Sequence, residues 1–320
     1  MKRLLAVLTF CLWAGWAFAQ AVYPAKPVRI IVPFPAGQTT DVVARALAQQ
    51  FSDSTGQSFF VDNKGGAAAI IGTEAAKNSP ADGYTLLMAS SGPLAINPTL
   101  YSKLPYDTLK DFEAIGMMVN VAQFLVVNKD FPASNLKDLI AYVKANPGKV
   151  NFGSGGSGLT NHLTMELLKV KAGLNITHVP YKGAAAALTG LIGGEIDMMF
   201  ESGPAVIPHI RTGKLKVIAV GSQRRSAVLP NVPSVAEAGV PGFDAISWAA
   251  FLAPAGTPKV IVDKLNAELN AAMKRPAFRE RLEALGADPV EMTPAETAAY
   301  FRSQIEMWGV AVKASGAKAD

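Results

Sequence analysis

The chain has 320 residues, of which 50% are hydrophobic and 17% charged, so it can form one large domain or two smaller ones around a substantial core. This composition argues against a disordered chain. The formal charge of +5 is scattered, without a basic run interleaved with aromatic residues, which argues against nucleic-acid binding and is compatible with anionic solutes.

The first 19 residues have the pattern of a signal peptide. Lys2 and Arg3 give a positive start, residues 4–18 form an apolar run, and the run ends in an Ala-Phe-Ala cleavage pattern at Ala19. The run is short for a membrane span, which needs about 20 residues, so export with cleavage is favoured over an uncleaved anchor. Cys11 is the single cysteine and lies inside this run, so the mature chain would have no disulfide, catalytic thiol or cysteine metal site.

After Pro24, short apolar runs typical of strands alternate with periodic stretches typical of helices. The predicted strands are residues 28–32, 59–61 and 84–88, then 150–152, 176–179, 196–200 and 216–220. The predicted helices are residues 42–51, begun by Thr39 and Thr40, then 70–78, 160–170 and 184–192. The alternation predicts parallel sheets with helices on both faces, and its repetition predicts two α/β lobes of similar design.

Two further apolar strands, residues 119–127 and 245–253, are interpreted as crossings between the lobes. Helices over residues 260–274 and 294–313 then return the chain to the first lobe. The predicted division is a signal peptide of residues 1–19, lobe 1 of residues 20–122 and 246–320, and lobe 2 of residues 123–245. Two crossing strands can act as a hinge, because a few residues at their ends absorb the rotation.

A glycine-rich loop at residues 153–158 lies between a predicted strand and a predicted helix. It matches the G-x-G-x-x-G pattern of dinucleotide sites, but no acidic residue follows in residues 170–194, where such a site needs one for the ribose. Small residues let the backbone approach a ligand, and free N–H groups at a helix start attract an anion. Anion binding is therefore favoured over a dinucleotide site or a flexible surface turn. The candidate residues of this loop are Ser154, Gly155, Gly156, Ser157 and Thr160.

Two loops of the first lobe occupy equivalent places, after strands that end near residues 32 and 88. Ligands bind beyond the carboxyl ends of strands in such sheets, so these loops can converge with the glycine-rich loop on one cleft. Asp41 is expected to cap the helix that follows. The candidate residues here are Phe34, Gly37, Gln38, Thr39, Thr40, Asp41, Ser90 and Ser91.

Four polar residues complete the candidate set. His162 lies one helical turn from Glu166, but two ligands without a third make a weak metal site, and His162 is interpreted as a hydrogen-bond donor at the helix start. Tyr181 and Lys182 follow a strand that contains His178, and Lys182 could attract a carboxylate or simply be solvated. Glu201 ends another strand and could face the same cleft.

Catalytic signatures are absent: the sequence has no G-x-S-x-G, no Walker lysine and no H-E-x-x-H. An exported hydrolase or isomerase would need an acid–base pair, for which only His162 with Glu166 or Glu201 is available. The favoured hypothesis is a receptor that needs no cofactor or metal and closes on a small carboxylate.

Several segments of the chain, in order from Tyr23 to the C-terminus, carry a resemblance to a known family. They include VRIIVPFPAGQTTDVVARALA, DGYTLLMASSGPLAINPTLY, NFGSGGSGLTNHLTMEL and HVPYKGAAAALTGLIGGEIDMMF. Together they resemble the Bug family, the periplasmic solute receptors of tripartite tricarboxylate transporters.

The resemblance implies a type II periplasmic binding fold (Venus flytrap) with two doubly wound lobes that close on an organic acid, an acidic amino acid or an aromatic carboxylate. It implies ligand contacts near residues 34–41 and 90–91 in the first lobe, and near 153–162 and 181–183 in the second. The implied partner is a tripartite tricarboxylate-type permease, with a membrane sensor kinase as the alternative, and the receptor is expected to be a monomer. Gln38, Ile70 and Glu201 depart from the family pattern, where Gly, Asn and Asp are common, and put the identity of the ligand in doubt.

Overall fold

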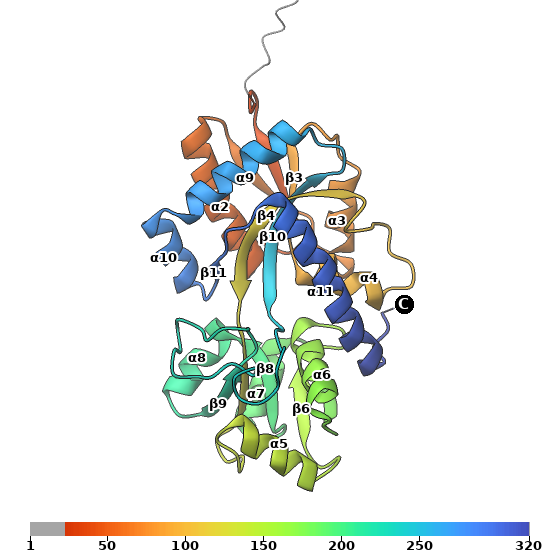
Figure 1. Cartoon of the computed structure of the whole chain (residues 1–320), viewed down its shortest axis with the longest axis vertical. Coiled ribbons are helices and arrows are strands. Elements are labelled where there is room, and N and C mark those ends of the chain that lie inside the picture. Colours follow the sequence, from red (N-terminus) through yellow and green to blue (C-terminus); the bar gives the residue numbers. More distant parts are fainter. Residues whose placement is uncertain (1–22, 320) are drawn as a thin grey trace, which may run out of the picture.

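The structure is a computed structural model and describes residues 23–319. Its two sheets define two α/β lobes, drawn one above the other in Figure 1. The expected signal peptide and the cleavage at Ala19 lie outside the described residues. Within residues 23–319, no helix combines the length and the apolar character that crossing a membrane requires.

The first lobe contains a six-stranded sheet in the order β11-β4-β10-β3-β1-β2. Its strands are β1 (Val28–Val32), β2 (Phe59–Asn63), β3 (Thr85–Ser90), β4 (Phe112–Val121), β10 (Ser247–Pro254) and β11 (Asp288–Pro289). Its helices are α2 (Thr39–Thr55), η2 (Ala67–Ala69), α3 (Ile70–Lys77), η3 (Gly92–Ile96), α4 (Asn97–Leu100), α9 (Lys259–Met273), α10 (Pro276–Ala284) and α11 (Pro294–Ser315).

The second lobe contains a five-stranded sheet in the order β7-β6-β8-β5-β9. Its strands are β5 (Gln123–Asn128), β6 (Asn151–Ser154), β7 (Thr177–Pro180), β8 (Met198–Ser202) and β9 (Leu215–Val220). Its helices are α5 (Leu136–Ala145), α6 (Thr160–Ala172), α7 (Ala184–Gly193) and α8 (Gly203–Arg211).

Apolar cores on both faces explain why the strands read as continuous apolar runs. On β1, Ile30 packs in one core with α2 and α9, whereas the next residue, Ile31, packs in another core with α3. In the second lobe, the neighbouring residues Met199 and Phe200 of β8 likewise pack in two different cores. A strand with helices on both sides buries every side chain and therefore loses the polar alternation of a half-exposed strand.

The crossing strands make both sheets mixed rather than parallel throughout. β1 pairs in parallel with β2 and β3, but β10 is antiparallel to both β3 and β4. β6 is parallel to β7 and β8, whereas β5 is antiparallel to β8 and β9. β10 and β5 run against their neighbours because each enters its sheet from the opposite lobe, and the short β11 is also antiparallel to β4.

The apolar run at residues 119–127 forms two strands and not the single strand that its pattern predicts. β4 ends at Val121 and β5 begins at Gln123, so only Ala122 separates strands of two different sheets. Hydropathy alone does not reveal this break, because both halves of the run are buried, each in a different lobe. The second crossing enters the first lobe at Ser247, the start of β10.

The C-terminal helix α11 packs against both lobes. It lies on β4 in the first lobe and also against α6 in the second, as Figure 1 shows. The Gln304 side chain on α11 accepts hydrogen bonds from the indole nitrogens of Trp248 (2.9 Å) and Trp308 (3.2 Å). Since Trp248 belongs to the crossing strand β10, this contact joins the helix to the hinge.

The lobes also touch at two points on either side of the crossing strands. A Cβ atom at Gly158, in the second lobe, would lie 2.7 Å from the Leu100 side chain at the end of α4. A Cβ atom at Gly286, in the first lobe, would lie 2.6 Å from the ring of Pro204 in α8. Both glycines have positive φ, so these close approaches depend on residues without a side chain.

Candidate ligand-binding cleft between the lobes

The carboxyl ends of the parallel strands of both sheets meet at the hinge. Ser90 ends β3 and pairs with Ala249, two residues into β10, whereas Ser247 at the start of β10 pairs with Val121 at the end of β4. On the other side of Ala122, Gln123 at the start of β5 pairs with Ser202 at the end of β8. The sheet register thus places two strand-end edges, one from each lobe, next to each other.

A cavity of about 130 Å³ lies at this junction. It is lined by residues of both lobes: Thr39, Thr40, Val43, Ser90, Val119, Val121, Ser247, Trp248 and Ala249 from the first, and Gln123 and Ser202 from the second. The predicted residues Thr39, Thr40 and Ser90 are therefore brought together. The lining combines hydroxyl and amide groups with an apolar floor, as in many small-molecule sites.

Two helices begin at this cavity. Thr39 and Thr40 are the first residues of α2, and Ser202 immediately precedes α8. The first amides of a helix have no partner within the helix and carry a partial positive charge. No side chain caps either helix start. The junction therefore presents the main-chain donors of α2 and hydroxyl groups suited to an anion. At α8 the donors are fewer, because Pro204 has no N–H and the Ser202 amide and hydroxyl bond to Glu201.

Asp41 holds the first-lobe loop and is 2% exposed. Its carboxylate accepts hydrogen bonds from the Gly37 amide (2.8 Å), the Asn63 amide group (2.9 Å) and the Arg45 guanidinium (3.1 Å). Burial alone would raise the pKa of Asp41, but these bonds and the charge of Arg45 outweigh it and lower that pKa. The expectation that Asp41 caps α2 is wrong, because Gln38 is the N-cap residue and Asp41 closes the loop from the first turn of the helix.

Replacing Asp41 with Ala is expected to lower the free energy of unfolding by about 2–3 kcal/mol, because the Gly37, Asn63 and Arg45 donors lose their shared acceptor. Urea denaturation at pH 7 measures the change. Asp53→Ala is the matched control, since Asp53 lies on the same helix and bonds only to the exposed Gln49 side chain. Equal stability of the two variants would show that Asp41 does not organise the loop.

The rest of the first-lobe candidates surround this anchor. Gly37, Gln38 and Thr39 are exposed, and Phe34 is half-buried, with its carbonyl bound to the Asn63 side chain. Ser91 is fully buried, and its hydroxyl lies 3.5 Å from that of Ser247. The exposed part of the loop is thus residues 35–39, whereas Ser91 is buried and contacts Ser247 at the start of β10.

The glycine-rich loop of the second lobe is hydrogen-bonded to the loop that carries Tyr181 and Lys182. The Tyr181 amide donates to the Ser154 carbonyl (2.9 Å), and the Gly183 amide donates to the Gly155 carbonyl (2.9 Å). The structure therefore joins the two second-lobe loops that the sequence singled out. Gly156 and Thr160 are half-buried, and Ser157 is exposed.

Two stacked histidines support the glycine-rich loop from the core side. The rings of His162 and His178 are stacked with their centroids 3.8 Å apart, and Phe152 stacks on His178 at 4.8 Å. His178 Nε2 lies 2.6 Å from the hydroxyl of Ser154, which is also within 3.1 Å of both the amide and the carbonyl of Gly156. The Ser154 hydroxyl is consequently buried and fully engaged within the loop.

His162 accepts a hydrogen bond at the helix start, so its interpretation as a donor there is wrong. The Gly158 amide donates to His162 Nδ1 (3.0 Å), so this nitrogen carries no proton. Burial, the adjacent His178 and the Lys169 ammonium lower the pKa of His162 from 6.5 to about 3. Burial and Lys169 lower the pKa of His178 to about 4. Both rings are neutral at pH 7.

The other second-lobe candidates differ in their availability. The Tyr181 hydroxyl donates to the Glu195 carboxylate (3.1 Å), and burial, followed by Glu195, raises its pKa. Lys182 is exposed. The Glu201 carboxylate is buried and accepts hydrogen bonds from the Asn161 side chain (3.2 Å) and from the amide and hydroxyl of Ser202 (2.8 and 2.9 Å).

Beside apolar residues, the lining includes Gln123, Ser202, Ser247 and Trp248, which were not among the candidate site residues, although Ser202 was expected to face the cleft together with Glu201. The Trp248 indole is bonded to Gln304 within the core, so this side chain also packs the hinge. The other three are polar residues at the ends of apolar strands, a signal that the sequence does contain. No group of three potential metal-binding side chains occurs among residues 23–319.

Comparison with known proteins identifies the family of the chain. The family model described as "Tripartite tricarboxylate transporter family receptor" matches residues 43–317. The chain belongs to the tripartite tricarboxylate transporter receptor family. Family membership confirms the resemblance, the type II binding-protein fold and the prediction that the chain is a periplasmic solute-binding receptor and not an enzyme.

Individual members of the receptor family cover nearly the whole chain. The protein BugT of Bordetella pertussis is 42% identical over 99% of both chains. The structure "R. palustris Rpa4515 with adipate" has a TM-score of 0.77 at 35% identity and covers 92% of this chain and 98% of its own. The structure of MatC from Rhodopseudomonas palustris with bound malate has a TM-score of 0.73 at 31% identity, with 91% and 100% covered.

Proposed function

We propose that this receptor captures a small carboxylate in the cleft between its lobes and delivers it to a tripartite tricarboxylate-type permease. The proposal is supported by one observation: a helix from each lobe, α2 and α8, begins at the same hinge cavity, which is lined by hydroxyl groups. A carboxylate there would exchange water for main-chain and hydroxyl donors, which offsets the cost of burying its charge. Two relatives have been solved with adipate and with malate, which are small carboxylates.

Closure of the lobes would bring the remaining donors to the ligand. The exposed residues Gln38, Thr39 and Ser157 belong to helix-start loops of opposite lobes, and Lys182 lies beside the glycine-rich loop. A ligand that contacts both lobes favours the closed state by its difference in affinity for the two states. We propose that residues 123–245 move as one unit against residues 20–122 and 246–320, as a monomer, after cleavage near Ala19 in the periplasm.

Ligand-dependent stabilisation tests the proposed class of ligand. We expect at least one mono-, di- or tricarboxylate to raise the free energy of unfolding by about 2.7 kcal/mol at a concentration of 100 times its dissociation constant. Thermal and urea unfolding of the mature protein with a panel of acids measures this change. Neutral sugars and organic cations of matched size are the controls, and stabilisation by these alone would overturn the carboxylate assignment.

A further inference from the structure

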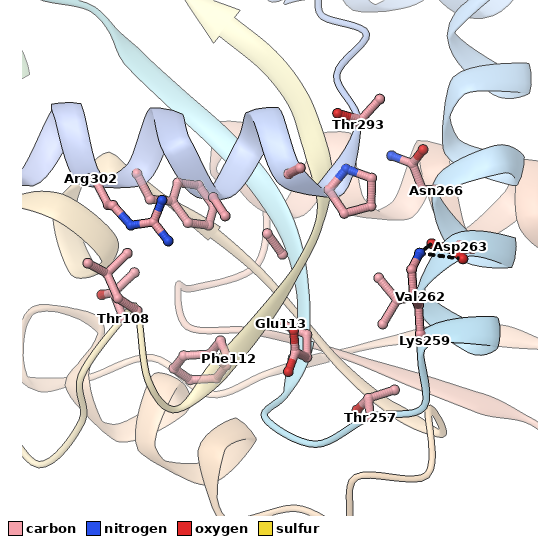
Figure 2. A pocket seen from close by; sticks show the side chains of 16 residues that line it. Thr108, Phe112, Glu113, Thr257, Lys259, Val262, Asp263, Asn266, Thr293 and Arg302 are labelled. Atoms are coloured by element: carbon pink, nitrogen blue, oxygen red, sulfur yellow. Dashed lines mark hydrogen bonds and ion pairs between the residues drawn. The ribbon is translucent and has the colours of Figure 1, made fainter.

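A groove of about 890 Å³ lies in the first lobe, away from the hinge cavity. Figure 2 shows it between the first turns of α9 and α11, with the beginning of β4 as its floor. β4 runs from Phe112 to Val121, and Val121 is at the hinge, so the Phe112 end is the far end of the strand. The groove shares no lining residue with the hinge cavity.

Half of the sixteen residues that line the groove are apolar. Phe112 and Ala114 form its floor, and Val262 and Phe301 contribute from the two helices. Leu109, on the loop at its edge, is 42% exposed, which is high for a leucine beside a concave surface. A cavity of this size and composition is in the range of small-molecule sites, which combine an apolar wall with a few convergent polar groups.

The convergent polar groups are Arg302 and Thr108. In Figure 2 the Arg302 guanidinium extends from α11 into the groove toward Thr108. Within residues 23–319, Arg302 forms no ion pair or hydrogen bond. The Thr108 hydroxyl is buried and also has no partner. An unpaired buried hydroxyl costs about 1–3 kcal/mol, so a rotation that turns it toward a bound acceptor would be favourable.

The charges at the other end of the groove limit what can bind. The Glu113 carboxylate is exposed there, and Lys259 is already paired with Asp263 (2.6 and 2.7 Å). A second negative group on a ligand would meet Glu113 without a free cation to compensate. Among residues 23–319, the groove therefore combines one unpaired cation, Arg302, one unpaired hydroxyl, Thr108, and an apolar part, and Glu113 disfavours a second anion.

We infer that this groove is a second binding site, for a monocarboxylate with an apolar body such as a medium-chain or aromatic acid. The carboxylate pairs with the Arg302 guanidinium and, after rotation of its side chain, with the Thr108 hydroxyl. The hydrocarbon part covers the accessible apolar lining, which is Leu109, Ala295 and Ala298. The inference does not depend on what the hinge cavity binds, because the two sites have no residue in common.

Isothermal titration of the mature protein with octanoate tests the inference. We expect the dissociation constant for octanoate to rise roughly tenfold or more in Arg302→Gln, because a charge-assisted hydrogen bond is lost. We expect no octanoate binding in Ala295→Trp, because the indole fills the groove. Arg281→Gln, on α10, and Ala299→Trp, on α11 but outside the groove lining, are the matched controls. Adipate binding, if present, should be the same in all four variants.

The outcomes separate clearly. Octanoate binding that is lost only in the two groove variants supports the site. No octanoate binding, or binding that is unchanged in Arg302→Gln and Ala295→Trp, overturns it. Urea denaturation of each variant verifies that the fold is intact, which both exposed positions should permit. If no acid of the panel binds in a way that survives both groove variants, the carboxylate proposed for the cleft is overturned and the groove result is unaffected.

Discussion

Replacing Ser90 with Phe is expected to abolish ligand capture while the protein remains folded. Ser90 is half-buried at the end of β3 and lines the hinge cavity, so a phenyl ring at this position would take space that a ligand needs. The Ser90 side chain makes no hydrogen bond to residues 23–319, so its removal leaves no group unpaired. We expect the dissociation constant for the best carboxylate to rise at least 100-fold, and the free energy of unfolding to change by about 1 kcal/mol or less.

Calorimetric titration and urea denaturation of the same preparation measure the two quantities. Ser303→Phe adds the same ring at an exposed position of α11 and serves as the control. Unaltered affinity in Ser90→Phe would remove the hinge cavity from the binding site. A large loss of stability would instead indicate that the lobes cannot accommodate the ring. The affinity of the smaller Ser90→Val variant would then show whether the hinge cavity binds the ligand.

Acidification is expected to destabilise the protein through the stacked histidines. Both folded-state pKa values, about 3 for His162 and about 4 for His178, are below the usual 6.5. The unfolded chain therefore binds more protons between pH 6.5 and 4, so this stability is fully present above pH 6.5 and is lost as the pH falls. With two rings, the slope reaches at most about 2.7 kcal/mol per pH unit.

Protonation has a specific structural consequence. A proton on His162 Nδ1 would remove the acceptor for the Gly158 amide, and two charged rings would lie 3.8 Å apart. The charged groups beside the pair are Glu166, 3.8 Å from His162 Nε2, and Lys169, which is bonded to Glu166. Since Glu166 is already shared with Lys169, it cannot fully compensate two imidazolium charges.

Urea denaturation from pH 7.5 to 4.5 tests this dependence. In His178→Phe, which keeps an aromatic ring in the stack, the histidine contribution to the slope should fall to one proton. Comparison with His209→Gln, a histidine on α8 outside the stack, accounts for the carboxylates that titrate in the same range. An identical slope in wild type and His178→Phe would show that the pair does not control the acid response.

The alternation of strands and helices was sufficient to predict the two lobes, because strands covered on both faces leave a clear apolar signal. It did not predict the antiparallel crossings or the break at Ala122. Those features depend on which sheet each strand joins, and strand pairing is set by partners more than 50 residues away, such as Gln123 with Ser202 and Val121 with Ser247.

The candidate site was predicted in outline for a similar reason. Helix-start loops can be recognised locally, and Thr39, Thr40 and Ser90 do line the hinge cavity. The direction of a hydroxyl cannot be recognised locally. Ser154 resembles a ligand donor in the sequence, yet its hydroxyl bonds to His178, a residue 24 positions away. No local pattern indicates that His162 and His178 stack, because their contact depends on how α6 packs against β7.

The two close approaches at Gly158 and Gly286 limit how the halves of the molecule can move. One contact joins Leu100 at the end of α4 to Gly158 just before α6, and the other joins Pro204 in α8 to Gly286 just before β11. In Figure 1, α4 and α6 lie on one side of the crossing strands, and α8 and β11 lie on the other. A tilt of the lobes about the line through these two contacts would preserve both, whereas a slide would press Leu100 or Pro204 against the main chain. The helix α11, which packs on β4 and also on α6, has to accommodate any such tilt.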